Sequence, residues 1–459
     1  MNNNLRQMYT QHPSSFRDPS GFIFENDGEI YRQVNLCYKE HYDLLMHSGL
    51  YDVLVSKKYL TQHTETEFPH PQEAYKILKP ERIPVISYPY EWCFSQLKDA
   101  ALLTLEIQRI ALEHGMTLKD SSAYNIQFIG CRPIFIDTLS FEKYQADTPW
   151  IAYRQYCEHF LTTLALVKYV DNTLQQLLYK NINGIPLEFA TKMLPLRTWL
   201  NIHLFIHIHL HAINKNKNDR KAISFRNNQK RFSKQSFFGL LNSLESIVSQ
   251  LQWQNRNEGW DNYYKTINPK YYSDKLDIVK ALLSKISPES VLDIGANLGE
   301  MSKLHEGDNT YTISIDSDYG CVELQYKTLK YSEYNILPLC MDILNPSPSL
   351  GWNSNERISF LDRKKYDLVM LLAIIHHMMA NGNLSLSQIL FFVKNLSHYA
   401  IIEYIPFDDP NIKKINQFNS NYQQYTEDEF QRVVSQYFTV IELKAIAGSE
   451  RVLYLLKVK

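Results

Sequence analysis

Residues 290–299 read Ser-Val-Leu-Asp-Ile-Gly-Ala-Asn-Leu-Gly, an apolar strand that runs directly into a turn with two glycines. In an open α/β sheet, ligands bind in the crevice outside the carboxyl ends of the strands, so this turn is an expected ligand site. Gly295 and Gly299 have no Cβ and let the backbone approach a ligand closely. Asp316 follows 17 residues after Gly299 at a second strand end, where a carboxylate can accept both hydroxyls of a ribose.

Apolar runs alternate with helix-length segments on either side of this turn. The further runs lie at 311–316, 336–340, 366–371 and 400–403, and a closing pair lies at 438–442 and 451–456 after a last helix over 426–435. This alternation predicts an α/β fold with a doubly wound, Rossmann-like parallel sheet whose last strand is antiparallel.

The glycine pattern of the turn differs from that of nicotinamide-binding folds, which use Gly-x-Gly-x-x-Gly to hold a pyrophosphate. Here Gly-x-Asn-x-Gly at 295–299 follows Asp293. A carboxylate at a strand end can help to hold an ammonium group, so the pattern suits a cofactor with an amino-acid tail. The alternative is a tight β-α turn in a domain without a ligand.

Four segments of this half resemble the motifs of class I S-adenosylmethionine-dependent methyltransferases. Residues 291–299 resemble the first motif, Ile315-Asp316 the second, Met341-Asp342-Ile343 the third, and Asp367 in Tyr-Asp-Leu-Val the fourth. The resemblance implies that S-adenosylmethionine is the cofactor, that Asp316 holds its ribose and that Asp342 contacts its adenine. The implied contacts to the methionine portion are Asp293, Gly295, Asn297 and Gly299.

The segment after the fourth strand bears on the acceptor. Leu371-Leu-Ala-Ile-Ile-His376-His377 lacks the Asn/Asp-Pro-Pro-Tyr/Phe of amide and base methyltransferases and resembles the fourth motif of many small-molecule O- and C-methyltransferases. His376 or His377 is a candidate general base because imidazole titrates near neutral pH. The alternative is that one histidine caps the turn and the other packs. Glu403, at the end of the next strand, is a further catalytic candidate that would orient the acceptor.

The N-terminal half carries a second spacing with chemical meaning. Asp120 precedes Asn125 by five residues, and Asn125 precedes Asp137 by twelve, across a short hairpin that follows an amphipathic helix over 94–113. The pattern resembles the catalytic loop and metal-binding aspartate of the protein-kinase and aminoglycoside-phosphotransferase superfamily. This resemblance implies an α+β kinase-like domain that uses ATP and Mg²⁺. Arg32 stands where that superfamily has a lysine, with Glu40 as its expected helix partner.

This second resemblance has clear departures. There is no Gly-rich phosphate loop, Leu118-Lys119 replaces His-Arg, and Asp137-Thr-Leu replaces Asp-Phe-Gly. Arginine also cannot be assumed to do the work of lysine. Three interpretations therefore stay open: nucleotide binding or transfer, a scaffold that presents substrate, and a chance spacing in an unrelated domain.

The chain length predicts two domains, because single cores seldom grow to 459 residues. We expect a kinase-like domain at 1–213, a basic linker with a connecting helix at 214–250, and the methyltransferase domain at 251–459. Within the linker, residues 214–234 hold eight lysines and arginines against one acid, Asp219. Such a run either gathers an anionic substrate or is a solvated connector.

Composition narrows the choice of partners and compartment. A formal net charge of -1, with 44% apolar and 21% charged residues, gives no global bias toward nucleic acid or membrane, so neither partner is expected. The six cysteines have no C-x-x-C spacing, and no apolar run has the length of a membrane span. We expect a reducing compartment and a cytoplasmic protein.

Two further clusters have alternative interpretations. His203, His207 and His211 share a helical face and either bind zinc or pack as ordinary core histidines, so no metal is assigned with certainty. Aromatic side chains before the first strand either cover the cofactor or seal a sheet face; they are Trp260, Tyr263, Tyr264, Tyr271 and Tyr272.

The expected function is methyl transfer from S-adenosylmethionine to a small-molecule or saccharide hydroxyl, or to carbon, with the kinase-like domain recruiting substrate or binding nucleotide. Such fusions resemble bacterial methyltransferases of polysaccharide, nodulation-factor-like or natural-product pathways. The alternatives are a bifunctional kinase-methyltransferase and a regulatory protein that senses the cofactor without turnover. The sequence determines neither the acceptor nor the oligomeric state.

Overall fold

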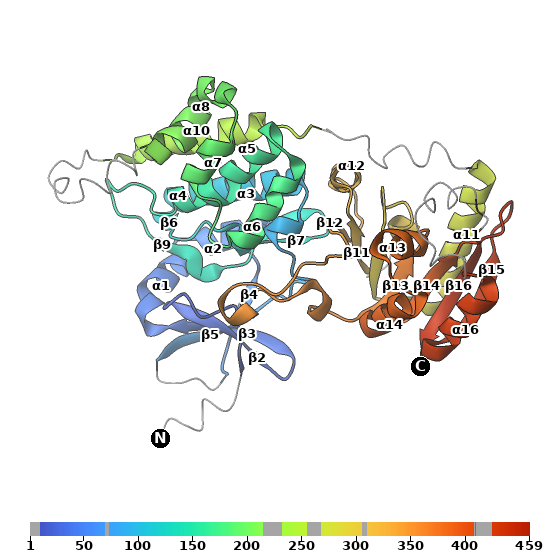
Figure 1. Cartoon of the computed structure of the whole chain (residues 1–459). Coiled ribbons are helices and arrows are strands. Elements are labelled where there is room, and N and C mark those ends of the chain that lie inside the picture. The colour runs from blue at the N-terminus through green and yellow to red at the C-terminus, as the bar shows by residue number, and fades with distance from the viewer. Residues whose placement is uncertain are drawn as a thin grey trace. The chain divides into compact units, whose positions relative to one another are not determined.

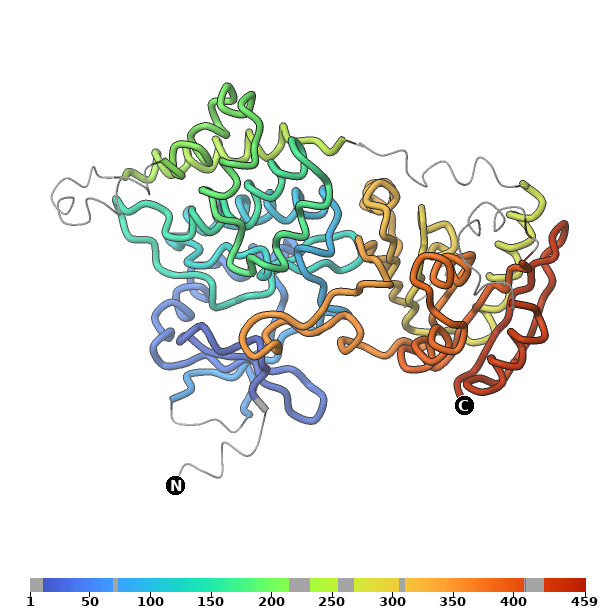
Figure 2. The backbone as a smooth tube through the Cα atoms, viewed as in Figure 1, coloured from blue at the N-terminus to red at the C-terminus, as the bar shows by residue number. Residues whose placement is uncertain are grey.

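The computed structural model describes residues 10–68, 73–213, 232–254, 268–304, 310–407, 409 and 425–459, and the chain divides into two compact units. The first unit comprises Met1–Phe128, Pro133–Gln254 and Ser349–Arg357. The second comprises Ile129–Arg132, Asn255–Pro348 and Ile358–Lys459. Figure 1 labels their elements, and Figure 2 traces the backbone of the chain, coloured from blue at the N-terminus to red at the C-terminus. No helix among the described residues is long and apolar enough to cross a bilayer.

The first unit begins with an antiparallel sheet in the order β1-β2-β3-β5-β4. Its strands are β1 (Thr10–Gln11), β2 (Gly21–Asn26), β3 (Glu29–Asn35), β4 (His63–Thr66) and β5 (Ala74–Pro80). Strands β2 and β3 are joined by Asp27 and Gly28, both with positive φ, as a type I′ turn requires. Between β3 and β4 the chain forms η1 (Leu36–Tyr38), α1 (Lys39–His47) and α2 (Leu50–Ser56).

The rest of the first unit is mainly helical. Helix α3 (Phe94–Glu113) matches the helix predicted at 94–113 and is followed by two small antiparallel pairs, β6 (Met116–Leu118) with β9 (Phe141–Lys143) and β7 (Ile126–Ile129) with β8 (Arg132–Phe135). The short 3-10 helices before and between these strands are η2 (Pro89–Glu91), η3 (Ala123–Asn125) and η4 (Thr138–Ser140).

The remaining helices of the first unit follow β9. They are α4 (Tyr153–Tyr156), η5 (Cys157–Leu161), α5 (Thr162–Tyr169), η6 (Asn172–Gln176), α6 (Leu177–Lys180), α7 (Leu187–Met193), η7 (Leu196–Leu200), α8 (Ile202–Leu204), η8 (Phe205–Leu210) and α10 (Lys234–Gln250). Helix α10, which we expected as a connecting helix, packs on α3 within this unit. The basic residues 214–231 lie outside the described part of the chain.

The second unit is built on a seven-stranded sheet in the order β12-β11-β10-β13-β14-β16-β15. The strands are β10 (Ser290–Ile294), β11 (Tyr311–Asp316), β12 (Ile336–Cys340), β13 (Tyr366–Leu371), β14 (Ser397–Tyr404), β15 (Phe438–Ala445) and β16 (Val452–Val458). The first five pair in parallel, and β16 lies antiparallel between β14 and β15. The predicted α/β sheet with an antiparallel last strand is therefore confirmed.

Helices cover this sheet. They are α11 (Pro269–Ile286), α12 (Tyr319–Leu329), α13 (Ile375–Gly382), α14 (Leu386–Leu396) and α16 (Glu427–Tyr437), with the short η10 (Ser302–Leu304) and η12 (Phe360–Asp362). The short η11 (Trp352–Ser354) belongs to the segment of the first unit at Ser349–Arg357. Asn268 caps α11 by accepting a hydrogen bond from the Lys270 amide, and Pro269 occupies its first turn. Val279 and Leu283 of α11 pack in one core cluster with Val291 and Leu368 of the central strands.

The register of the central strands places three strand ends side by side. Ile294 of β10 lies opposite Ile315 of β11, and Asp316 of β11 lies opposite Cys340 of β12. Strand β10 is the point at which the strand order reverses, since β11 follows it on one side and β13 on the other. The ligand crevice of such a sheet is expected at this edge.

Candidate functional site

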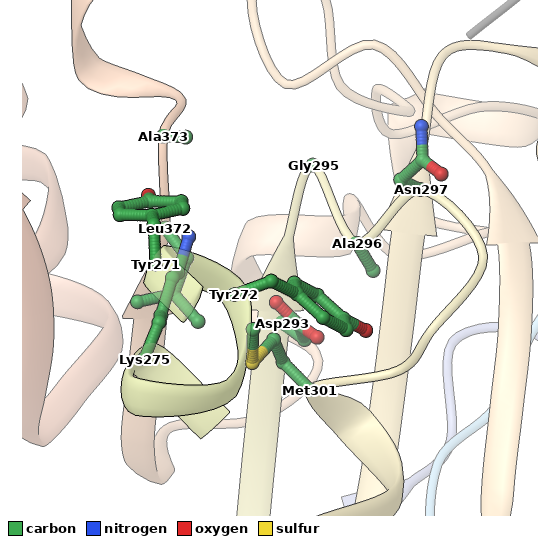
Figure 3. A pocket seen from close by; sticks show the side chains of 10 residues that line it. All are labelled: Tyr271, Tyr272, Lys275, Asp293, Gly295, Ala296, Asn297, Met301, Leu372 and Ala373. Carbon is green, nitrogen blue, oxygen red and sulfur yellow. The ribbon is translucent and has the colours of Figure 1, made fainter. Parts of the chain in front are cut away.

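A pocket opens at the carboxyl end of β10, and Figure 3 shows the side chains around it. It encloses about 430 Å³, its open mouth included. The start of α11, the turn after β10 and the end of β13 supply its walls. The lining residues are Tyr271, Tyr272, Lys275, Asp293, Gly295, Ala296, Asn297, Met301, Leu372 and Ala373.

Asp293 is the buried acid of this pocket. Its Oδ2 accepts a hydrogen bond of 2.6 Å from Ser302 Oγ, whereas Oδ1 has no hydrogen-bond partner among the described residues. Burial raises the pKa of Asp293 to about 6, against the lowering effects of the Ser302 hydrogen bond and of the nearby Lys275. At neutral pH the pocket thus holds a desolvated carboxylate, which favours a cationic group as its partner.

The turn after β10 has a backbone that only certain residues adopt easily. Gly295, Asn297 and Gly299 all have positive φ, at 72°, 53° and 73°. A Cβ on Gly299 would lie 1.7 Å from Nε2 of Gln325, so a side chain at this position has no room. The sequence therefore needs glycine here for conformation and for space.

Asp316 ends β11 beside this turn and helps to shape it. Its Oδ2 accepts a hydrogen bond of 2.8 Å from the Asn297 amide, and its Oδ1 accepts one of 2.8 Å from the Asp318 amide. Burial raises the pKa of Asp316, although these backbone donors oppose the rise. Asp342, just beyond β12, is exposed and accepts a hydrogen bond of 2.9 Å from the Leu344 amide. Neither acid lines the pocket, but both stand at the strand ends predicted for them.

These residues fit the cofactor that the sequence implies. The amino-acid end of S-adenosylmethionine carries an ammonium group, and Asp293 is a buried acid that lines the pocket and uses Oδ2 for its hydrogen bond with Ser302. The glycine turn exposes backbone next to that carboxylate. The donor set and the turn are therefore compatible with the methionine portion of this cofactor.

Glu403 has a different environment from the one expected of an acid that handles the acceptor. It lies fully buried at the end of β14 and accepts hydrogen bonds from Tyr271 Oη at 2.6 Å, Lys275 Nζ at 2.7 Å and Arg451 Nη1 at 3.3 Å. Burial alone would raise the pKa of Glu403, but the charges of Lys275 and Arg451, with the hydrogen bonds, lower it to about 2. Arg451 also pairs with Asp409 at 2.8 Å. We call Glu403, Tyr271, Lys275 and Arg451 the buried ion cluster.

The two histidines lie at the start of α13, just past the pocket. His376 is buried, its Nδ1 has no hydrogen-bond partner among the described residues, and burial, with His377 and Arg451 nearby, lowers its pKa to about 3. His377 is only partly buried, and burial lowers its pKa as well. Both imidazoles are therefore uncharged at neutral pH. Ala373, three residues before His376, holds a φ of 58°, a strained conformation of the kind that is common at functional sites.

Asp367, in the segment that resembles the fourth motif, lies away from the pocket. Asp367 lies near the start of β13, and its Oδ2 accepts hydrogen bonds from the backbone amides of Glu289 and Ser290. A residue at the amino end of the strand is far from the carboxyl edge, where Leu372 and Ala373 line the pocket instead. Sequence analysis missed Lys275 and Arg451. Their only sequence signal was the spacing of Tyr271 and Lys275, one helical turn apart.

The first unit brings together the four residues of the candidate kinase-like site. Arg32 on β3 donates to Asp137, which also accepts from Ser140 Oγ, and Asn125 donates to Ser140 Oγ at 3.1 Å. Burial raises the pKa of Asp120, the hydrogen bond from the Ser122 amide opposes the rise, and the charge of Asp137 adds to it. Arg32 and Ser140 more than offset the effect of burial on Asp137 and lower its pKa.

Two other expectations for the first unit can be compared with the structure. Glu40 does not pair with Arg32, because α1 turns it toward solvent, where its Oε1 accepts a hydrogen bond of 3.0 Å from Lys143 Nζ. Ser243 Oγ lies 2.9 Å from His203 Nδ1 and 2.8 Å from His207 Nε2. Across the described ranges, no group of three histidine, cysteine, aspartate or glutamate side chains could hold a metal ion.

The aromatic residues expected as a lid divide into two sets. Tyr271 and Tyr272 line the pocket from α11. Trp260, Tyr263 and Tyr264 lie outside the described residues.

Comparison with known proteins gave one extensive sequence match. The chain is 30% identical over 452 residues to the nodulation protein NoeA of Rhizobium meliloti (strain 1021), covering 96% of this chain and 94% of that protein. Similar solved structures include the N-methyltransferase NodS from Bradyrhizobium japonicum WM9, with a TM-score of 0.32, 10% identity and coverage of 42% of this chain and 98% of that one. The magnesium protoporphyrin IX methyltransferase ChlM from Synechocystis PCC 6803, solved with bound SAM, has a TM-score of 0.32, 14% identity and coverage of 44% and 92%. No family model matches the chain.

Proposed function

The chain belongs to the family of the nodulation protein NoeA, and from the site it carries we propose that it is an S-adenosylmethionine-dependent methyltransferase. We propose a small-molecule or saccharide hydroxyl as its acceptor, with carbon as the alternative. The observation that carries the proposal is Asp293: a buried carboxylate with one oxygen unpartnered among the described residues, in a pocket beside the turn of Gly295 and Gly299.

The proposed cofactor contacts follow the strand ends. Asp293 holds the ammonium group of the methionine portion, and the turn at 295–299 lies against its backbone. Asp316, at the end of β11, accepts the ribose hydroxyls, and Asp342, at the end of β12, contacts the adenine amino group. The register of β10, β11 and β12 supports this assignment, because the carboxyl ends of these strands lie side by side and the three acids therefore lie along one edge of the sheet.

When bound, S-adenosylmethionine supplies the methyl group. The residues of the chain then have two tasks, which are to hold the acceptor in line and to take its proton. We propose that His377 takes the proton, because its imidazole is uncharged and able to accept at neutral pH. His376 is the alternative, but burial lowers its pKa to about 3 and makes it the weaker base. Glu403 is a poor base with a pKa of about 2, so we propose that it positions Tyr271 and Lys275 at the pocket wall.

The test is calorimetric titration of full-length variants with S-adenosylmethionine. Asp316→Ala is expected to abolish binding, and Asp277→Ala on the exposed face of α11 is the matched control that should bind like the wild type. An unchanged affinity in Asp316→Ala would contradict the assignment of the strand-end acids. Tight cofactor binding without transfer to any acceptor would instead favour a regulatory protein that senses the cofactor.

For the first unit we propose nucleotide binding as a second function, with substrate recruitment as the alternative. The observation in its favour is that Arg32, Asp120, Asn125 and Asp137, which are far apart in sequence, form one cluster. Titration with ATP and Mg²⁺ tests it. Arg32→Ala should lose binding relative to Arg82→Ala, an exposed arginine whose Nη1 donates to a backbone carbonyl. If titration of the wild type with ATP and Mg²⁺ gives no heat, nucleotide binding is contradicted and the unit is a scaffold that recruits substrate.

A further inference from the structure

The first unit exposes large apolar side chains from three successive helical elements, α7, η7 and the α8–η8 helix. We call these side chains the apolar patch: Phe189, Met193, Leu196, Leu200, Ile202 and Ile206. Leu196 and Leu200 are 83% and 89% exposed, and Ile202 is 61% exposed. Isolated exposed leucines are ordinary, but a run of this density on a folded surface marks an interaction site.

The three elements form one local surface. Helix α7 and the 3-10 helix η7 both contact η8, and α8 contacts η7. Figure 1 shows α7 and α8 in the green part of the first unit. Each element turns its other residues inward: Leu187 and Ala190 of α7 and Leu204 and Ile208 of the α8–η8 helix are buried. These elements therefore contribute buried side chains to the core of the unit, and the exposed apolar side chains are not part of that core.

The fully exposed charges within the apolar patch are cationic. They belong to Lys192 and Arg197, whereas Glu188 of α7 is partly buried and pairs with Arg154 at 3.0 Å. An apolar surface with cationic surroundings is the combination that binds the interface of anionic lipids.

Other partners fit this combination less well. A second copy of the chain would bring two cationic surfaces together, which costs energy through like-charge repulsion. Nucleic acid is bound by cations interleaved with aromatic rings that stack on bases, whereas Leu196, Leu200, Ile202 and Ile206 are aliphatic. We propose that the apolar patch docks the protein on the surface of an anionic phospholipid membrane. This proposal departs from the expectation, based on composition, of no membrane partner.

Vesicle sedimentation of the full-length protein tests the proposal. Vesicles of phosphatidylcholine with about a third phosphatidylglycerol are compared with pure phosphatidylcholine, at low and high salt. The wild type should sediment at least about tenfold more strongly with the anionic vesicles at low salt, and salt should weaken that binding. Equal binding to both kinds of vesicle at every salt concentration, or no binding to either, would overturn the proposal.

A variant locates the binding surface. Leu196→Asn combined with Leu200→Asn should lose at least about tenfold of the vesicle binding, and its fold should persist because both side chains are exposed. Ile441→Asn with Leu443→Asn is the matched control, since these side chains are 50% and 51% exposed on β15 of the second unit. Circular dichroism checks that both variants fold.

Two results would refute the assignment of the surface. Vesicle binding that persists in the patch variant, or falls equally in the control, would place the lipid contact elsewhere. The second result combines two observations: the wild type binds no vesicles, and light scattering shows that it is a dimer whereas the patch variant is a monomer. The apolar patch would then be an interface between copies of the chain.

Discussion

Replacing Asp293 with asparagine is expected to stabilise the protein without its cofactor and to abolish cofactor binding. The carboxylate is fully buried, and only one of its oxygens has a hydrogen-bond partner among the described residues. An ion in this position is poorly solvated, so folding is less favourable than it would be with a neutral side chain of the same shape. Asparagine retains an oxygen that can accept from Ser302 and removes the charge.

The magnitude follows from the pKa of Asp293. Burial raises that pKa from 3.8 to about 6. At about 1.4 kcal/mol for each pH unit, the ionised carboxylate costs about 3 kcal/mol of folding free energy. Because the folded pKa lies above the unfolded one, the cost is absent below the unfolded pKa, grows as the pH rises toward 6 and is complete above it. The gain from Asp293→Asn should therefore be largest above about pH 6 and vanish below about pH 4.

Thermal unfolding of the wild type and of Asp293→Asn across this pH range measures the effect. A gain of about 3 kcal/mol corresponds to a rise in Tm of roughly 6–12 °C for a domain of this size. Adding S-adenosylmethionine should raise the Tm of the wild type and leave that of the variant unchanged. A variant that is less stable than the wild type above pH 6, or that still responds to the cofactor, would refute this account of Asp293.

Glu403→Gln should lower the free energy of unfolding, measured by chemical denaturation, by about 3–5 kcal/mol, because it leaves buried cations without their carboxylate. The control Glu442→Gln, at the surface, should leave the denaturation midpoint unchanged. Equal midpoints for these two variants would argue against a role for the buried ion cluster. Gly299→Ala should destabilise by more than about 1 kcal/mol and lose the cofactor, while Gly239→Ala, in open space on α10, should stabilise by about 0.5–1 kcal/mol. His377→Ala should keep the wild-type affinity for S-adenosylmethionine but slow transfer of a labelled methyl group by about 10²–10⁴-fold, and unchanged transfer would exclude it as the base.

Local sequence patterns were enough to predict the strands of the parallel sheet and the turn at the carboxyl end of β10. The run from Val291 to Gly299 combines a buried strand with a turn whose conformation and lack of space both require glycine, so a few adjacent residues determine it. The acids at 316 and 342 follow the same rule, because Asp316 ends one buried strand and Asp342 lies two residues after the next.

Contacts between distant residues were not predictable in this way. Glu403 appeared to be an acid free to act on an acceptor, but Lys275, 128 residues earlier, and Arg451, 48 residues later, neutralise it. No periodicity links three such positions, and only the packing of α11 and β16 on β14 brings them together. The position of Asp367 depends on the fold in the same way, because the motif indicates the strand but the end of the strand that a residue occupies decides whether it reaches the pocket.

The central claim is tested most directly by titrating the full-length wild-type protein with S-adenosylmethionine in a calorimeter, with S-adenosylhomocysteine as the second ligand. The account predicts saturable binding of both at one site per chain, weakening as the pH falls through 6 and Asp293 becomes protonated. No heat and no rise in Tm with either ligand would contradict it.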